Sequence, residues 1–166
     1  MDASEADWPT WLDRHGAALV LLARQFVPAQ ADAEDIVQDA FVRFWRTRGT
    51  VADPAAYLYA CVKRGVLDRL RGQQRRLRRE EQAARPEAEP AFIAPAEKAE
   101  RAALIQAALA TLPTEQAEVL VMKIWGGLSF AQIAMATDSS PNTSASRYRY
   151  ALARLREILA EEPSYE

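Results

Sequence analysis

The 166-residue sequence contains a single cysteine and a single histidine. One cysteine, Cys61, excludes an internal disulfide and a zinc site built from several cysteines, and its apolar neighbours favour a packed thiol. One histidine, His15, leaves little scope for a histidine-based metal site or a catalytic triad, so a surface or interhelical position is expected for it. The sequence therefore points to no metal and no other cofactor.

Long apolar runs and glycine are also scarce. No apolar run approaches the roughly 20 residues that a membrane span needs, and no secretory signal peptide opens the sequence, so we expect a cytoplasmic protein without membrane contact. Six glycines with abundant Ala, Leu, Arg and Glu favour an all-α fold. The formal net charge is only −2, so any nucleic-acid binding must depend on local basic patches.

The last third of the chain predicts two helices, a turn and a longer third helix. Pro113 suits a first helical turn, and Gly126-Gly127 ends the helix that begins there. Ser129 is placed to cap a short helix, and Ser140-Pro141 restarts the chain as N-cap and first helical residue. A short helix, a tight turn and a longer helix together predict a helix-turn-helix motif.

The longer helix has two distinct faces. At about 100° per residue, its core face carries Ser144, Ala145, Tyr148, Leu152, Leu155 and Leu159. Its outer face carries groups that can reach base edges and phosphates, on Asn142, Thr143, Ser146, Arg147, Arg149, Tyr150 and Arg154. From Ser139 to Arg156 there is no Asp or Glu, whereas a merely solvated helix usually mixes both signs. The pattern favours DNA binding over a solvated surface.

Two further helices are predicted near the start of the chain, over Trp8–Val27 and from Asp32 to Gly49. The first has an inward side of Trp11, Leu12, Leu19, Leu22, Ala23 and Phe26. The second has a broad apolar side of Ile36, Val37, Ala40, Phe41 and Phe44. Its opposite side carries Asp35, Gln38, Asp39, Arg43 and Arg46, with Trp45 near the border. That polar side is either the solvated back of a core helix or a protein-docking face anchored by Trp45.

A third helix is predicted to begin at Pro54. Its apolar side carries Leu58, Tyr59, Val62, Val66 and Leu70, and a separate stripe carries Tyr57, Arg64, Asp68 and Arg71, with Lys63 on its flank. Between Lys63 and Arg79, eight basic side chains face Asp68 as the single acid. This excess exceeds what the helix dipole needs, so it favours a nucleic-acid backbone, with nearby rings stacking on exposed bases.

The segment after Arg79 changes in composition. Prolines at positions 86, 90 and 95 interrupt a stretch rich in Ala and Glu, which predicts a flexible linker over residues 80–96. It would divide the chain into two small helical domains, residues 1–79 and 97–166. A helix over Ala96–Thr111 is expected to pack on the later helices through Leu104, Ile105, Ala108 and Leu109.

Three segments, in this order, resemble one known family. DAEDIVQDAFVRFWR (Asp32 to Arg46) resembles conserved region 2 of bacterial sigma factors, and AYLYACVKRGVLDRLR (Ala56 to Arg71) resembles its continuation, which recognises and opens the −10 promoter element. LPTEQAEVLVMKIWGGLSFAQIA followed by NTSASRYRYALARLR resembles region 4, which reads the −35 element. Two domains on a linker, with little else, is the layout of the extracytoplasmic-function group of the sigma-70 family. The resemblance implies a region 2 helical bundle and a region 4 helix-turn-helix.

The resemblance also implies roles for individual residues. Contact with core RNA polymerase falls on Asp35, Gln38, Asp39, Phe41 and Trp45. Contact with the −10 element falls on Tyr57, Lys63, Arg64, Asp68, Arg69 and Arg71, and the loop Arg48–Asp53 corresponds to one that captures a flipped base. Contact with the −35 element falls on Asn142, Thr143, Ser146, Arg147 and Arg149. The implied partners are promoter DNA, core RNA polymerase (the β′ clamp and the β flap) and an anti-sigma protein.

The expected function is therefore that of a sigma factor, which is not itself an enzyme. An alternative is a helix-turn-helix transcriptional regulator with an N-terminal helical sensor domain, which explains the C-terminal half equally well but not the basic third helix. An enzyme with a helical fold finds no support in a nucleotide-binding loop, a metal cluster or a nucleophile–base arrangement. Because acids in the first helix and linker oppose the basic patches, the free chain is expected to bind promoters weakly until it assembles with polymerase.

Overall fold

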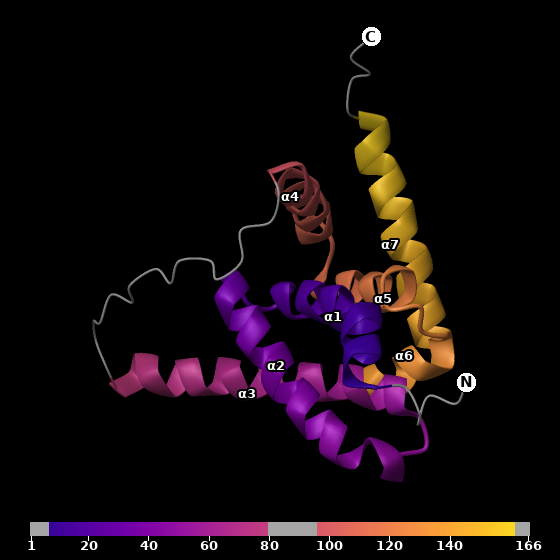
Figure 1. Ribbon diagram of the computed structural model, residues 1–166. Helices are drawn as coiled ribbons and strands as arrows, with labels where there is room; N and C mark the ends of the chain where they lie inside the picture. The colour runs from indigo at the N-terminus through magenta and orange to yellow at the C-terminus, as the bar shows by residue number, and fades with distance from the viewer. Residues whose placement is uncertain (1–6, 80–95, 162–166) are drawn as a thin grey trace.

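The computed structural model describes residues 7–79 and 96–161. Within these residues the chain forms seven α-helices, a single turn of 3-10 helix and no β-strand (Figure 1). The N-terminal unit consists of α1 (Trp8–Arg24), α2 (Gln30–Thr47), the 3-10 turn Arg48–Thr50 and α3 (Pro54–Arg79). The C-terminal unit consists of α4 (Ala96–Ala110), α5 (Thr114–Ile124), α6 (Phe130–Thr137) and α7 (Pro141–Glu161). The predicted linker lies outside the described residues, except that Ala96 begins α4.

Local capping chemistry fixes where the helices of the N-terminal unit begin. The Asp7 carboxylate accepts a hydrogen bond from the Thr10 backbone N–H at 3.0 Å and so caps α1. Asp53 does the same for α3, accepting from the Ala56 backbone N–H at 3.0 Å directly before Pro54. The sequence predicted the start of α3 correctly, whereas α2 begins two residues before the predicted Asp32.

The helix-turn-helix motif is confirmed in detail. Ser129 and Gln132 form a reciprocal capping box at the start of α6. Asp138 ends α6 with a left-handed backbone (φ 52°), which turns the chain sharply toward α7. The Ser140 hydroxyl then accepts a hydrogen bond from the Thr143 backbone N–H at 3.1 Å and caps α7.

Aromatic rings fill the core of the N-terminal unit. Phe41 and Phe44 from α2 pack edge to face with ring centroids 5.7 Å apart, and Phe44 also contacts Trp11 of α1. Tyr59 of α3 and His15 of α1 are buried beside them. The interhelical position considered for His15 is the one the structure shows.

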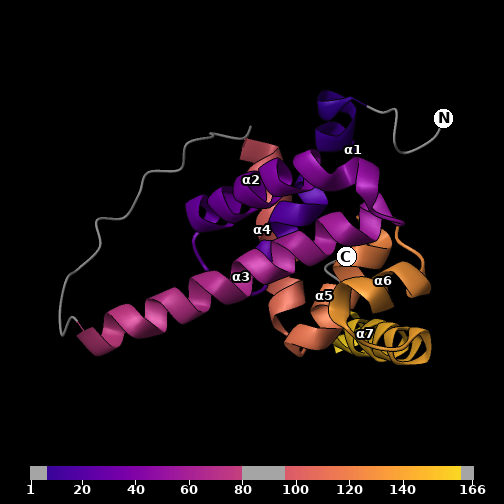
Figure 2. The ribbon, with the colours of Figure 1, turned by 90° about the horizontal axis from the view of Figure 1, so that it is seen from below.

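The two units pack against each other. In addition to contacts within each unit, α3 lies against α6 and α1 lies against α5, and the buried apolar residues of both units form one continuous cluster. The C-terminal half of α3 instead extends away from the remaining helices (Figures 1 and 2). The division into separate domains at residues 79 and 97 therefore stays a prediction, because in this structure the units share a core.

Three leucines that the sequence placed inward are exposed, namely Leu12, Leu104 and Leu159. On α4, Ile105 and Leu109 face the protein, and Leu104 lies on the outer side of that contact. On α7, the end that carries Leu159 extends beyond α5 and α6 (Figure 1). Helical periodicity gives the direction of a face but not how far the neighbouring element extends along it.

Candidate nucleic-acid and polymerase interface

The residues predicted to contact polymerase lie along α2, but they are not equally accessible. Asp35, Gln38 and Asp39 are exposed on one side of the helix. Phe41 is 1% exposed, because its ring packs on Trp8 with centroids 4.5 Å apart. Phe41 therefore supports α2 from within and offers no surface for direct contact.

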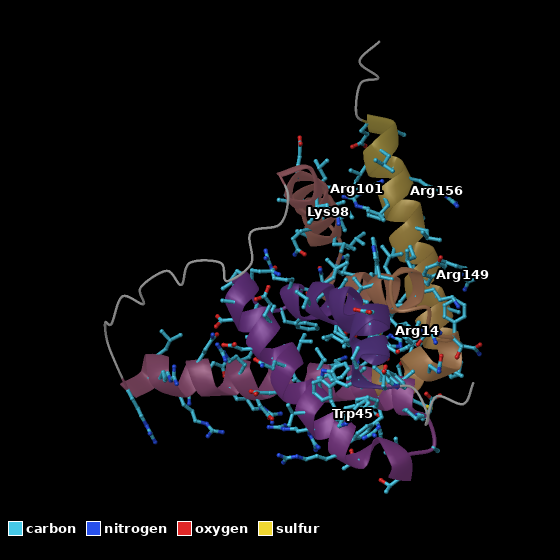
Figure 3. All side chains as sticks on the ribbon, in the orientation of Figure 1. Arg14, Trp45, Lys98, Arg101, Arg149 and Arg156 are labelled. Atoms are coloured by element: carbon cyan, nitrogen blue, oxygen red, sulfur yellow. The ribbon has the colours of Figure 1, made fainter. Side chains whose placement is uncertain are left out.

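Trp45 lies at the border of that polar side and is partly buried. Its ring packs edge to face on Trp8 with centroids 5.2 Å apart. The Arg48 guanidinium lies over the same ring, 3.5 Å from its centroid. Two contacts therefore restrict the orientation of the Trp45 ring, which is labelled in Figure 3, and this suits an aromatic anchor for a partner protein.

The residues predicted to contact the −10 element lie on α3 and divide into two groups. Arg64, Asp68 and Arg71 are exposed. The other three have protein partners: Tyr57 accepts a hydrogen bond from Thr47 at 3.3 Å, Lys63 pairs with Glu118, and Arg69 pairs with Asp32. Solvent therefore reaches the first group directly, whereas contacts within the protein orient the side chains of the second group.

A hollow of about 170 Å³ between α2 and α3 brings the two predicted sets together. Asp39 of the polymerase set and Asp68 and Arg69 of the −10 set all line it. Cys61 also lines this hollow, where burial raises the pKa of its thiol and keeps it protonated. The sequence placed these residues on separate helices, and the packing of α2 on α3 makes them one surface.

The end of α3 is the most basic part of the described chain. Its exposed cations are Arg71, Arg75, Arg76, Arg78 and Arg79. Because this part of α3 extends away from the other helices, its cations can approach a nucleic-acid backbone from several sides (Figure 2).

The residues predicted to contact the −35 element lie on the first three turns of α7. Asn142 and Arg149 are exposed, and Thr143, Ser146 and Arg147 are partly buried. Arg149 donates a hydrogen bond to the Ser146 hydroxyl at 3.2 Å, and both line an open hollow of about 680 Å³ with Asn142. Figure 3 shows Arg149 and Arg156 on the outer side of α7. This face presents the amide, hydroxyl and guanidinium groups that read a major groove.

Sequence reasoning missed the acids that face two of these cations. Glu115 lies 3.3 Å from Arg147, and Glu118 lies 2.9 Å from Lys63. Both acids belong to α5, three residues apart. The available signal was Glu118 itself, a carboxylate inside the apolar run from Ala117 to Met122, where a charge needs a partner.

Two classes of site receive no support from the described residues. In residues 7–79 and 96–161, no group of three or more His, Cys, Asp or Glu side chains is arranged to hold a metal ion. Among the helices in those ranges, none is long and apolar enough to cross a membrane.

The family models and the relatives agree with each other. Residues 11–76 match the model for Sigma-70 region 2, and residues 102–155 match the model for Sigma-70, region 4. The chain is 31% identical over 155 residues to the ECF RNA polymerase sigma factor SigL of Mycobacterium tuberculosis, a match that covers 90% of this chain and 86% of that relative. It is 34% identical over 148 residues to the RNA polymerase sigma-E factor of Streptomyces coelicolor, covering 86% and 80%.

The chain belongs to the extracytoplasmic-function group of the sigma-70 family. As a sigma factor, it binds core RNA polymerase and directs promoter-specific initiation of transcription. The resemblance drawn from the sequence is thereby confirmed. A regulator with an unrelated sensor domain is disfavoured, because the segment in question matches region 2.

Two solved structures share the fold of this sigma factor. One is the sigma factor RpoE in complex with the anti-sigma factor NepR from Bartonella quintana, with a TM-score of 0.67 and 21% identity over 95% of this chain and 99% of that chain. The other is CnrH in complex with the cytosolic domain of CnrY, with a TM-score of 0.64 and 24% identity over 97% and 94%. At these identities the likeness concerns the fold.

Proposed function

We propose that the N-terminal unit docks on core polymerase through α2 and contacts the −10 element through α3, while α7 contacts the −35 element. The observation that carries this proposal is the placement of two cationic, polar helix faces, on α3 and α7, inside the two segments that match region 2 and region 4.

The polymerase contact is assigned to the exposed side of α2. Asp35, Gln38 and Asp39 would meet the β′ clamp, with Trp45 as the aromatic anchor and Phe41 as its internal support. The C-terminal unit would meet the β flap. Acids on a docking helix favour a basic partner surface, because complementary charge accelerates encounter and fixes orientation.

The −10 contact is assigned to Tyr57, Lys63, Arg64, Asp68, Arg69 and Arg71, with the loop Arg48–Asp53 receiving a flipped base. Opening a duplex costs a few kcal/mol for each unstacked base. Stacking of a base on an aromatic ring contributes about 1–3 kcal/mol of favourable free energy, which offsets part of this cost. Tyr57 is the first aromatic residue after the loop in the sequence. Arginines along α3 would hold the backbone of the separated strand.

The −35 contact is assigned to Asn142, Thr143, Ser146, Arg147 and Arg149. Amide and guanidinium side chains at the start of a recognition helix form bidentate hydrogen bonds with purines in the major groove. The capped, sharply turned start of α7 gives these side chains a fixed direction.

The chain acts as an initiation factor without catalytic activity of its own. It works in the cytoplasm, because its polymerase and promoters are there. An anti-sigma protein regulates it; the structurally similar sigma factor RpoE forms a complex with the anti-sigma factor NepR.

Run-off transcription tests the proposal directly. Purified core polymerase would be combined with the chain and a library of promoter fragments with randomised −35 and −10 positions. The proposal expects transcripts that depend on the chain and converge on two sequence elements at fixed spacing. A chain that gives no transcripts, or transcripts without a −10 preference, would refute it.

A further inference from the structure

The C-terminal unit covers the first half of α3, the half nearest the predicted base-capture loop. Lys63 Nζ donates a hydrogen bond to Glu118 Oε1 of α5 at 2.9 Å. The Gln132 amide of α6 donates to the Asp53 carboxylate at 3.2 Å. These contacts join the helices of the −10 surface to those of the −35 surface.

Glu118 is the unusual member of this interface. Its side chain is 2% exposed, whereas Lys63 is 23% exposed. Burial raises the pKa of Glu118 above its ordinary value, and the hydrogen bond from Lys63 acts in the opposite direction. Among the described residues, no group donates a hydrogen bond to the second carboxylate oxygen, Oε2.

A buried carboxylate with one unpaired oxygen depends on the partner that its other oxygen has. Replacing a buried ion pair with apolar side chains is often neutral or stabilising, whereas removing one partner is costly. The definite effect of Glu118 is electrostatic, because it neutralises a cation assigned to DNA and does so only while the two units are packed together.

The neighbouring acid on α5 provides a contrast. Glu115 lies 3.3 Å from Arg147, but both belong to the C-terminal unit. That pair can persist whether or not the units are in contact. The pair of Lys63 and Glu118 must break when the two units separate. It therefore stabilises the packed arrangement and not the separated one.

We infer that Glu118 is an autoinhibitory counter-ion, which holds the two units together through Lys63 and keeps the first half of α3 from DNA in the free chain. Separation of the units exposes Lys63 for its contact with the −10 element. The effect on DNA binding rests on the proposed function. The closed arrangement, in which the two units are packed together, does not.

Closure is measured by the distance between the units in the full-length free chain. Fluorophores at Ala17→Cys on α1 and Met135→Cys on α6, in a Cys61→Ser background, report that distance by single-molecule energy transfer; Ala17 and Met135 are both exposed. The unsubstituted pair should give a predominantly closed population. Glu118→Gln should raise the ratio of open to closed molecules by about tenfold or more.

Lys63→Met tests the same pair by removing its cation. Because Lys63 is partly exposed, this variant should fold even if Glu118→Gln does not. It removes the charge, keeps the apolar stem and should open the chain as well. Glu115→Gln is the matched control, because it neutralises an acid on the same helix whose ion-pair partner, Arg147, lies in the same unit. The negative charge of Glu115 also raises the pKa of Glu118, so its removal favours the ionised, paired form of Glu118 and should not increase the open population.

DNA binding separates release of Lys63 from simple opening. With a fluorescein-labelled duplex of mixed sequence at low salt, Glu118→Gln should bind more tightly than the unsubstituted chain, whereas Lys63→Met should not. The inference is overturned if the unsubstituted chain is already open, if neither substitution changes the distance, if Glu115→Gln opens the chain equally, or if Glu118→Gln gains no DNA affinity. Loss of run-off transcription would refute the proposed function and leave the distance measurement intact.

Discussion

The Nδ1 atom of His15 lies 3.0 Å from the hydroxyl oxygen of Tyr59, in a buried contact between α1 and α3. Trp11 stacks on the same imidazole ring, with centroids 5.2 Å apart. Burial, with a smaller contribution from the charge of Arg14 (labelled in Figure 3), lowers the pKa of His15 from 6.5 to about 4. The imidazole is therefore neutral in the folded protein at pH 7.

This histidine makes the folded protein sensitive to acid. Between pH 6.5 and 4 the unfolded chain binds a proton at His15 that the folded chain does not, so the free energy of unfolding falls as the pH falls. The loss at pH 5 should be about 2 kcal/mol, measured by urea unfolding at pH 7 and pH 5. In His15→Gln this part of the pH dependence should disappear. An identical pH profile in both proteins would contradict the assignment.

Gly126 should not tolerate a side chain. A Cβ there would lie 2.6 Å from the Met122 carbonyl oxygen and 2.7 Å from the Tyr59 hydroxyl oxygen, so Gly126→Ala forces α5 and α3 apart. We expect a loss of about 1–3 kcal/mol in the free energy of unfolding. Gly72→Ala is the control, because nothing lies within 4 Å of its Cβ and a helical alanine should stabilise by roughly 0.5–1 kcal/mol. Equal changes in the free energy of unfolding would show that the structure accommodates a Cβ at Gly126 despite the close contacts.

Replacing the recognition-helix cations should weaken promoter binding by the holoenzyme. Arg149→Ala should reduce affinity by about 1–3 kcal/mol if the guanidinium reads a base, and should lower the salt dependence by about one phosphate contact. Arg147→Ala should act in the same direction. Arg156→Ala, about two turns further along the helix than Arg149, is the control and should have little effect. Footprints that stay unchanged in both test variants would remove them from the −35 contact.

Reversing a charge on the exposed side of α2 should impair assembly with polymerase. Asp39→Arg is expected to lower the yield of holoenzyme in a pull-down with core polymerase, without changing the circular dichroism spectrum. Asp13→Arg makes the same charge change at an exposed position on α1 and should leave assembly intact. If the two variants assembled equally well, α2 would lose its assignment as the docking helix.

Local signals in the sequence were sufficient for most helix starts. Ser129 with Gln132, Ser140 with Pro141, and Asp53 with Pro54 each satisfy backbone N–H groups through near neighbours, and such chemistry needs no knowledge of the fold. The same holds for the outer face of α7, since helical spacing alone separates Asn142 and Arg149 from Ser144. The ordered motifs were likewise enough to recognise the family.

Contacts between distant parts of the chain were beyond the reach of those signals. Helical spacing placed Phe41 on the apolar side of α2 and Trp45 near its border, and the structure buries Phe41 and leaves Trp45 partly exposed. Periodicity could not show that Trp8 packs on both rings, because Trp8 lies on another helix, more than 30 positions earlier in the chain.

Residues that are close together in the chain were enough to specify most of the helices and the polar faces of α3 and α7. The order of the motifs along the chain was enough to recognise the sigma-factor family. Which cations are exposed and which are paired depends on the packing of the helices, because Lys63 and Glu118 lie 55 positions apart and meet only when the two units pack. A charge pattern gives the sign of a surface, and packing decides whether that surface is open to DNA.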